Sequence, residues 1–268
     1  MTIRSLFVFA LVAALAACHR GQVDAVPRPE LGGALATVGT PQQVDSLWAG
    51  GREFFNHGKW QRAQESFERM IAVAQPGDER LPQAHFFLAE CYFATNSHLQ
   101  AVREFRRVSD ETPDASIASE ALLRAGDAYA DLWRRPELDP TYGHTALATY
   151  QELLNRYPGT SAAQRAQARI QDLQNRFAYK QYRAGLFYFR LKAYDSAILY
   201  FRDLVATYPR AAIVPETLVR LVKAYQILGY KEDVNETCGY IRRYYPQAPG
   251  ADELCPAGEP VAADTTKR

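Results

Sequence analysis

Few side chains in this sequence have the types and spacing that catalysis or metal binding requires. The five histidines, at positions 19, 57, 85, 98 and 144, are scattered, and no Gly-rich phosphate loop or nucleophile–base pair accompanies them. His85, Cys91 and His98 are spaced so that one helix face could not present all three to a metal ion. The sequence therefore predicts neither an enzyme nor a protein with a metal or another cofactor.

One cysteine does have a specific chemical context. Cys18 follows a basic start, Met1–Arg4, and an apolar run of about 13 residues that ends in Leu15-Ala16-Ala17. A helix needs roughly 20 residues to span a bilayer, so residues 1–17 predict a secretory signal peptide. Its end resembles the bacterial lipobox, in which a peptidase cuts before a cysteine whose thiol forms a thioether to lipid. The alternative is an ordinary signal with a cysteine there by chance.

The segment after the signal indicates how the protein is held. A lipidated Cys18 would carry three acyl chains, enough for lasting attachment to a membrane. The next residue is histidine, and the absence of aspartate there favours the outer membrane. Residues 18–43 are rich in proline and glycine and have no helical apolar stripe, so they predict a flexible tether.

Charge and composition argue against nucleic acids as partners. The chain is 47% hydrophobic with a formal net charge of +1, and removal of residues 1–17 takes away Arg4, which leaves a net charge of zero. No basic tract interleaves with aromatic residues, so nucleic-acid binding is not expected.

From residue 44 onward the sequence repeats one pattern. A small residue is followed at regular spacing by an aromatic residue, an alanine, a second aromatic residue and a proline. The five copies are Gly51, Phe54, Ala63, Phe67 and Pro76; Ala89, Tyr92, Ala101, Phe105 and Pro113; Gly126, Tyr129, Ala146, Tyr150 and Pro158; Gly185, Tyr188, Ala197, Phe201 and Pro209; and a degraded copy, Val222, Tyr225, Val234, Cys238 and Pro246.

This pattern is similar to the tetratricopeptide repeat. Small side chains allow two helices to cross closely, aromatic side chains fill the space beside the crossing, and proline ends the second helix. We therefore expect an all-α fold, a tetratricopeptide-repeat superhelix of about five helix-turn-helix units, in which stacked neighbours share a continuous core.

Two departures from the plain repeat are informative. The third copy contains eight extra residues, Arg134–Thr141, which must lengthen its turn into a loop. After Pro158, an N-cap signal at Gly159-Thr160-Ser161 opens an uninterrupted helical pattern of roughly 29 residues, about 40 Å long. This long helix would join N-terminal repeats at 44–160 to C-terminal repeats within 161–249, and residues 250–268 predict a disordered tail.

Together these features resemble the BamD family of outer-membrane assembly lipoproteins. The resemblance rests on the lipobox, the five repeats, the Leu138-Asp139-Pro140-Thr141 loop and the long helix, and covers about residues 44–247. It implies a scaffold lipid-anchored at the periplasmic face of the outer membrane. The C-terminal repeats would hold a periplasmic domain of a BamA-like barrel protein, and the N-terminal repeats would receive unfolded outer-membrane proteins. The tether is longer than the family pattern, and the first repeat lacks its terminal Tyr-Pro.

A different repeat lipoprotein, such as a pilus-assembly or cell-wall coordination factor, is the alternative. It would share the lipobox and the repeats, although not both the loop and the long helix.

The resemblance and the repeat geometry suggest which residues bind proteins. The first helices of stacked repeats line the concave face, and there we expect a client-binding groove made of Trp48, Arg52, Phe55, Phe86, Glu90, Phe93, Asp127 and Asp131. Some of these side chains could instead pack between helices. For the barrel partner we expect contacts around Arg183, Arg190, Lys223 and Gln226.

The three cysteines beyond Cys18 leave at least one thiol free. Cys91 falls inside a strong helical pattern, which predicts a buried thiol. Cys238 and Cys255 could form a disulfide bond that pins the C-terminal tail, or both could be free.

Overall fold

The computed structural model of the protein describes residues 39–114 and 116–255. The predicted signal peptide 1–17, Cys18, most of the tether and the last part of the tail lie outside these residues. Every regular element within them is a helix: α2 (Pro41–Asn56), α3 (Trp60–Val73), α4 (Leu81–Ala94), α5 (His98–Glu111), α6 (Ala118–Leu132), α7 (Thr141–Arg156), α8 (Ser161–Arg190), α9 (Tyr194–Thr207), α10 (Val214–Leu228), α11 (Lys231–Tyr244) and α12 (Ala251–Leu254). None of the described helices is long and apolar enough to cross a membrane.

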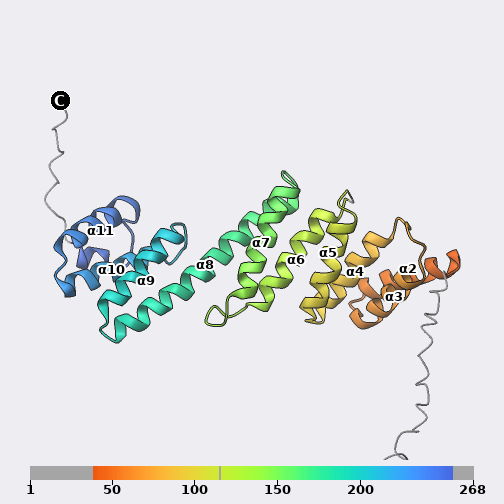
Figure 1. Ribbon diagram of the computed structural model, residues 1–268, viewed down its shortest axis with the longest axis horizontal. Helices are drawn as coiled ribbons and strands as arrows, with labels where there is room; N and C mark the ends of the chain where they lie inside the picture. Colours follow the sequence, from red (N-terminus) through yellow and green to blue (C-terminus); the bar gives the residue numbers. More distant parts are fainter. Residues whose placement is uncertain (1–38, 115, 256–268) are drawn as a thin grey trace, which may run out of the picture. The chain divides into compact units, whose positions relative to one another are not determined.

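The helices pair in the order that the repeats predict. α2 packs against α3, α4 against α5, α6 against α7, the long helix α8 against α9, and α10 against α11 (Figure 1). Each pair also packs against the next pair, so the apolar faces of neighbouring repeats cover one another. The all-α repeat fold with about five units is confirmed.

The small residues at the first repeat position allow this pairing. A Cβ atom on Gly126 would lie 2.4 Å from Cε1 of Tyr150, and one on Gly185 would lie 2.4 Å from Cε1 of Phe201. Such distances are well inside van der Waals contact, so any larger side chain would push the two helices apart. In the fifth repeat the sizes are exchanged, because Val222 stands at the small position and Cys238 at the aromatic one.

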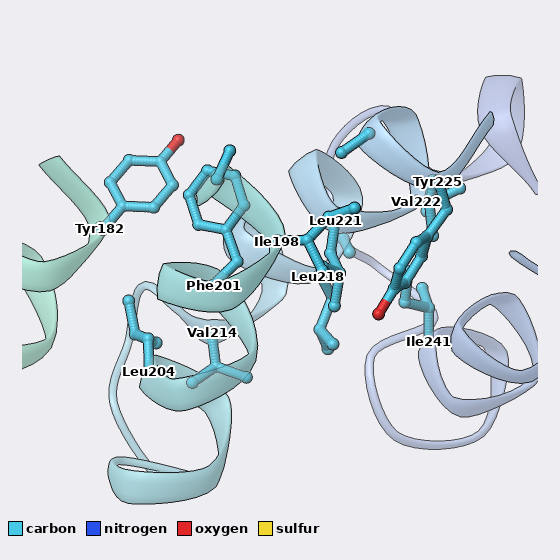
Figure 2. Packing of buried hydrophobic residues seen from close by; sticks show 14 of the residues in the cluster. Tyr182, Ile198, Phe201, Leu204, Val214, Leu218, Leu221, Val222, Tyr225 and Ile241 are labelled. Carbon is cyan, nitrogen blue, oxygen red and sulfur yellow. The ribbon is translucent and has the colours of Figure 1, made fainter. Parts of the chain in front are cut away.

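The long helix is also confirmed, at 30 residues. Thr160 caps its first turn by accepting a hydrogen bond from the backbone N–H of Ala163 at 3.1 Å. The helix belongs to two cores in turn. Leu173 and Phe177 pack with α6 and α7, whereas Tyr182 packs with α9 and α10. Figure 2 shows the second of these cores, in which Phe201, Leu204 and Val214 gather close to the long helix.

The structure corrects both predicted boundaries of the repeat body. Helix α2 begins at Pro41, so the last residues of the predicted tether 18–43 are helical. Their N-cap is Thr40, whose hydroxyl accepts from Gln43 N–H at 3.3 Å. The sequence did not reveal this helix start, because Pro41 was interpreted as a tether residue, although proline is favourable in the first turn of a helix.

The predicted disordered tail 250–268 likewise begins with structure. α12 follows Pro246 by five residues, as α10 follows Pro209. The turns before the two helices have the same hydrogen bonds, from Ala248 N–H to Tyr245 O at 2.9 Å and from Ala211 N–H to Tyr208 O at 3.0 Å. α12 therefore stands where the first helix of a sixth repeat would begin and ends after one turn.

Candidate protein-binding surfaces

A polar pocket of about 220 Å³ lies between α4, α6, α7 and α8. Three of the residues predicted for client binding, Phe93, Asp127 and Asp131, line it directly. The rest of its wall consists of Arg124, Ala130, Tyr150, Arg169, Asp172, Leu173 and Arg176. The pocket thus combines two aromatic side chains with several guanidinium and carboxylate groups.

Arg124 organises the pocket. Its Nε and Nη2 donate to the two carboxylate oxygens of Glu90 at 2.6 and 2.8 Å, and its Nη1 donates to Asp127 at 3.1 Å. The guanidinium carbon also lies 4.3 Å from the centre of the Phe93 ring, a cation–π contact. Glu90, the fourth predicted residue at this pocket, therefore acts through Arg124 and fixes its orientation.

Asp127 collects hydrogen bonds from three helices. Besides Arg124, it accepts from the Tyr150 hydroxyl at 2.7 Å and from Arg169 Nε at 3.1 Å. Burial raises the pKa of Tyr150, and the charge of Asp127 raises it further. Sequence reasoning missed Arg124, Arg169 and Arg176, because their meeting depends on how α8 packs beside α6.

The other four predicted client-binding residues do not line this pocket. Trp48 and Arg52 line a separate pocket of about 430 Å³ on α2, where the Arg52 guanidinium lies 5.7 Å from the Trp48 ring centre. Phe55 and Phe86 are partly buried and pack between helices. Phe55 lies against Phe87, with ring centres 4.9 Å apart, and Phe86 lies 5.4 Å from Phe105.

A second surface lies on the C-terminal half of α8, and we call it the α8 groove. It has a volume of about 780 Å³ and is lined by Pro136, Glu137, Lys180, Arg183, Ala184, Phe187, Arg190 and Leu191. Two of the predicted partner residues, Arg183 and Arg190, therefore lie in one groove. The same groove has two large exposed apolar side chains, Phe187, which is 56% exposed, and Leu191, which is 61% exposed.

The inserted loop of the third repeat forms one wall of the α8 groove. Lys180 Nζ donates to the backbone carbonyls of Glu137 at 3.3 Å and Leu138 at 2.9 Å. Arg183 lies 3.8 Å from the Glu137 carboxylate. The loop and the long helix, which the sequence identified as two separate departures from the repeat, thus build one surface.

Lys223 and Gln226, the other two residues expected at the partner interface, do not line the α8 groove. Both lie on α10 and are exposed. Gln226 Nε2 donates to the carbonyl oxygen of Leu254 at 2.9 Å and so holds α12 against α10. The sequence could not reveal this role, since α12 itself was hidden in the tail composition.

The three cysteines beyond Cys18 form one disulfide bond and leave one free thiol, which is one of the two arrangements that the sequence allowed. Cys238 and Cys255 are joined by a disulfide bond that ties α11 to the end of α12. Cys91 is a free, buried thiol, as predicted, and burial raises its pKa to about 12.

Two residues of types that catalysis often uses contact each other in the interior. His85 and Glu104 are both buried and hydrogen-bonded to each other at 2.8 Å. Within residues 39–114 and 116–255, no three His, Cys, Asp or Glu side chains lie close enough together to hold a metal ion.

Comparison with known proteins connects these surfaces to a family. The model of a family described as outer membrane lipoprotein YfiO matches residues 41–239. The chain belongs to this family. The match spans the first four repeats, the inserted loop and the whole of α8, and it ends within α11 of the fifth repeat.

Curated relatives of this YfiO-family chain carry a common name. This chain is 23% identical over 203 residues to the outer membrane protein assembly factor BamD of Caulobacter vibrioides. The match covers 76% of this chain and 66% of the relative. The chain is 24% identical to the protein of the same name from Rickettsia prowazekii, over 76% of this chain and 81% of the relative. These similarities support a role in outer-membrane protein assembly.

Among solved structures, the YfiO-family chain is similar to the tetratricopeptide-repeat domain of P58(IPK). The identity is 13% and the TM-score is 0.43, over 80% of this chain and 54% of the other.

Proposed function

We propose that the protein is a non-catalytic scaffold lipoprotein of the machinery that assembles β-barrel proteins in the outer membrane. In this proposal the lipid on Cys18 anchors it to the periplasmic face of that membrane. The α8 groove binds a periplasmic domain of a BamA-like barrel protein, and the polar pocket receives unfolded barrel clients. The observation that carries the proposal is the α8 groove, because it is built from the inserted loop and the long helix within the part of the chain that matches the family.

The composition of the α8 groove suits a protein partner. Phe187 and Leu191 are large apolar side chains that remain mostly exposed, and side chains of this kind mark interaction sites when they gather beside charged residues. Lys180, Arg183 and Arg190 surround them, so a partner domain with an apolar patch and an acidic rim would fit.

The long helix gives this surface a fixed position. α8 packs with α6 and α7 at its N-terminal end and with α9 at its C-terminal end. A partner bound at the groove would therefore be held in a defined position relative to the polar pocket, which α8 also lines through Arg169 and Arg176. This coupling suits a scaffold that passes a client from one site to the next.

The polar pocket suits a short extended segment of a client. Phe93 offers apolar surface to a side chain of the client. Arg169 and Arg176 can donate to carbonyl or carboxylate oxygens of the client, and Asp131 and Asp172 can accept from its backbone N–H groups. Such a segment would gain both an apolar contact and main-chain hydrogen bonds.

The test is purification of the tagged full-length protein from its native envelope in mild detergent, followed by mass spectrometry. The unchanged protein should recover a barrel protein with repeated periplasmic domains. The variant Phe187→Glu should recover at least about tenfold less of it, because a charge would be buried against the apolar patch.

Leu99→Glu is the matched control, since Leu99 on α5 is 52% exposed and outside the groove. It should leave recovery unchanged. Recovery of pilus or cell-wall proteins in place of a barrel partner would contradict the proposal and leave the fold intact.

A further inference from the structure

A second groove lies between α9 and α11, the second helices of the last two repeats, with α10 as its floor. It has a volume of about 600 Å³ and shares no residue with the α8 groove. Leu218 and Leu221 of α10 form an apolar base, and Arg202, Val205, Tyr240 and Tyr244 stand at the sides. Figure 2 shows Leu218 and Leu221 close to Ile198 in this part of the core.

We call the line of contact between the second helices of two neighbouring repeats a seam. In the second and third repeats the seam lies between α5 and α7, and ion pairs close it. There Arg106 of α5 donates to Glu152 of α7 at 3.0 Å and to Thr149 at 3.3 Å. Arg156 of α7 returns across the seam and donates to Asp110 at 2.8 Å. Two guanidinium–carboxylate pairs thus hold α5 and α7 together.

The repeat register shows what has changed between α9 and α11. Arg202 follows Phe201 as Arg106 follows Phe105, so the first guanidinium is retained. Cys238 of α11 has the repeat position of Tyr150 of α7. Two and six residues further on, α7 has Glu152 and Arg156, whereas α11 has Tyr240 and Tyr244. Both partners that would close the seam are therefore tyrosines, and the seam stands open as a groove.

Two guanidinium groups at the open seam form no ion pair with a carboxylate of the described residues. Within residues 39–114 and 116–255, the ion pairs include neither Arg202 nor Arg243. Arg202 contacts the phenol of Tyr225, and Arg243 lies 5.3 Å from the ring centre of Tyr244. Asp233 and Glu236 of α11 also line the groove, and their charges act on the same Tyr225 phenol that Arg202 contacts, but neither forms an ion pair with Arg202.

We propose that the α9–α11 groove is a docking site for an extended segment of another protein that carries an acidic residue beside an apolar one. The segment's carboxylate takes the place that Glu152 has in the closed seam and pairs with Arg202. The adjacent apolar side chain packs on Leu218 and Leu221 between Tyr240 and Tyr244. This is a third protein-binding surface, besides the polar pocket and the α8 groove, and it does not depend on which protein occupies the α8 groove.

The test places a photo-crosslinking benzoylphenylalanine at Tyr244, which is 54% exposed and lines the groove, in the full chain in its native envelope. The same probe at Tyr142, which is 39% exposed on α7, is the control for chance collisions. The proposal expects a protein adduct at Tyr244 only, and a crosslinked peptide in which Asp or Glu lies next to an apolar residue.

Two further variants test the chemistry of the adduct. Arg202→Gln should lower its yield about tenfold, because the segment's carboxylate loses its ion pair. Tyr240→Glu, which restores the seam-closing residue, should lower the yield equally, whereas Tyr240→Phe should retain it. Recovery of the barrel partner through the α8 groove serves as the folding control for all three variants.

Several results would overturn the proposal. They are an adduct no stronger than that at Tyr142, an adduct to a second copy of this chain or to lipid, a crosslinked segment without an acidic residue, and a yield that Arg202→Gln leaves unchanged. If the protein without substitutions failed to recover a barrel partner while the adduct at Tyr244 still formed, the proposed function would be contradicted and this inference would stand.

Discussion

Gly51 in α2 approaches Phe67 in α3 so closely that a Cβ atom on Gly51 would lie 2.7 Å from Cε1 of the ring. Phe67 is fully buried, so its ring has no room to move away. Gly50, the preceding residue, has no atom within 4 Å of the place where its Cβ would stand. The two adjacent glycines therefore separate the effect of helix propensity from the effect of helix crossing.

Alanine at these two positions should change stability in opposite directions. Gly51→Ala should lower the free energy of unfolding by about 1–3 kcal/mol, because the new methyl group overpacks the crossing. Gly50→Ala should raise it by up to about 1 kcal/mol, because alanine favours the helix over glycine. Urea unfolding followed by circular dichroism measures both, and equal effects would contradict the close crossing.

The sequence was sufficient to predict the repeat fold because each marked residue meets another residue in the same or the next repeat. Gly126 and Tyr150 are a pair of this kind, and their spacing along the chain is enough to show that two helices cross. The long helix was predictable for a similar reason, since a continuous apolar pattern without a breaker needs only local information.

The candidate surfaces were only partly predictable, because they depend on how separate helices pack. Phe93 and Asp127 were expected on one face, and they do share a pocket. The sequence did not predict that Arg124 of α6 contacts both of them or that Arg169 of α8 contacts Asp127. Phe55 and Phe93 have the same repeat position, four residues after the small residue, and only Phe93 lines this pocket. Cysteine spacing alone could not decide between a disulfide bond and free thiols at Cys238 and Cys255.

The disulfide bond between Cys238 and Cys255 should stabilise the end of the repeat stack. It closes a loop of 17 residues, and restriction of the unfolded chain by such a loop contributes about 3 kcal/mol. Reduction should therefore increase amide hydrogen exchange in α11 and α12 before it affects α2–α7. Cys255→Ser should show the same fast exchange with or without reductant, and a further effect of reductant on that variant would contradict this assignment.

Arg124 should be important for stability as well as for client binding. Arg124→Leu leaves the carboxylates of Glu90 and Asp127 without their shared partner in a half-buried pocket, so we expect a loss of about 2 kcal/mol in the free energy of unfolding. Arg124→Lys keeps the charge and loses the two-pronged contact to Glu90, so its loss should be smaller. Thermal unfolding ranks the three proteins, and similar stability of the leucine variant and the unchanged protein would refute this role.

The buried phenol of Tyr150 should make stability depend on pH in the alkaline range. Its pKa is raised in the folded protein, so the folded state keeps the proton that the unfolded chain releases above pH about 10. The contribution is complete below that pH and is lost as pH rises, with a slope of about 1.4 kcal/mol per pH unit from this group. Tyr150→Phe should therefore have a shallower decline between pH 9.5 and 11 than the unchanged protein, and identical slopes in urea titrations would contradict the prediction.

Depletion of the chain in its native organism tests the central claim most directly. The measured quantity is the amount of correctly folded β-barrel protein in the outer membrane, read from the heat-dependent mobility of barrels on gels. The proposed function predicts that folded barrels decrease as the protein is depleted, and that the unchanged gene restores them whereas Phe187→Glu does not. Normal barrel levels throughout depletion, with a defect in pili or in the cell wall, would contradict it.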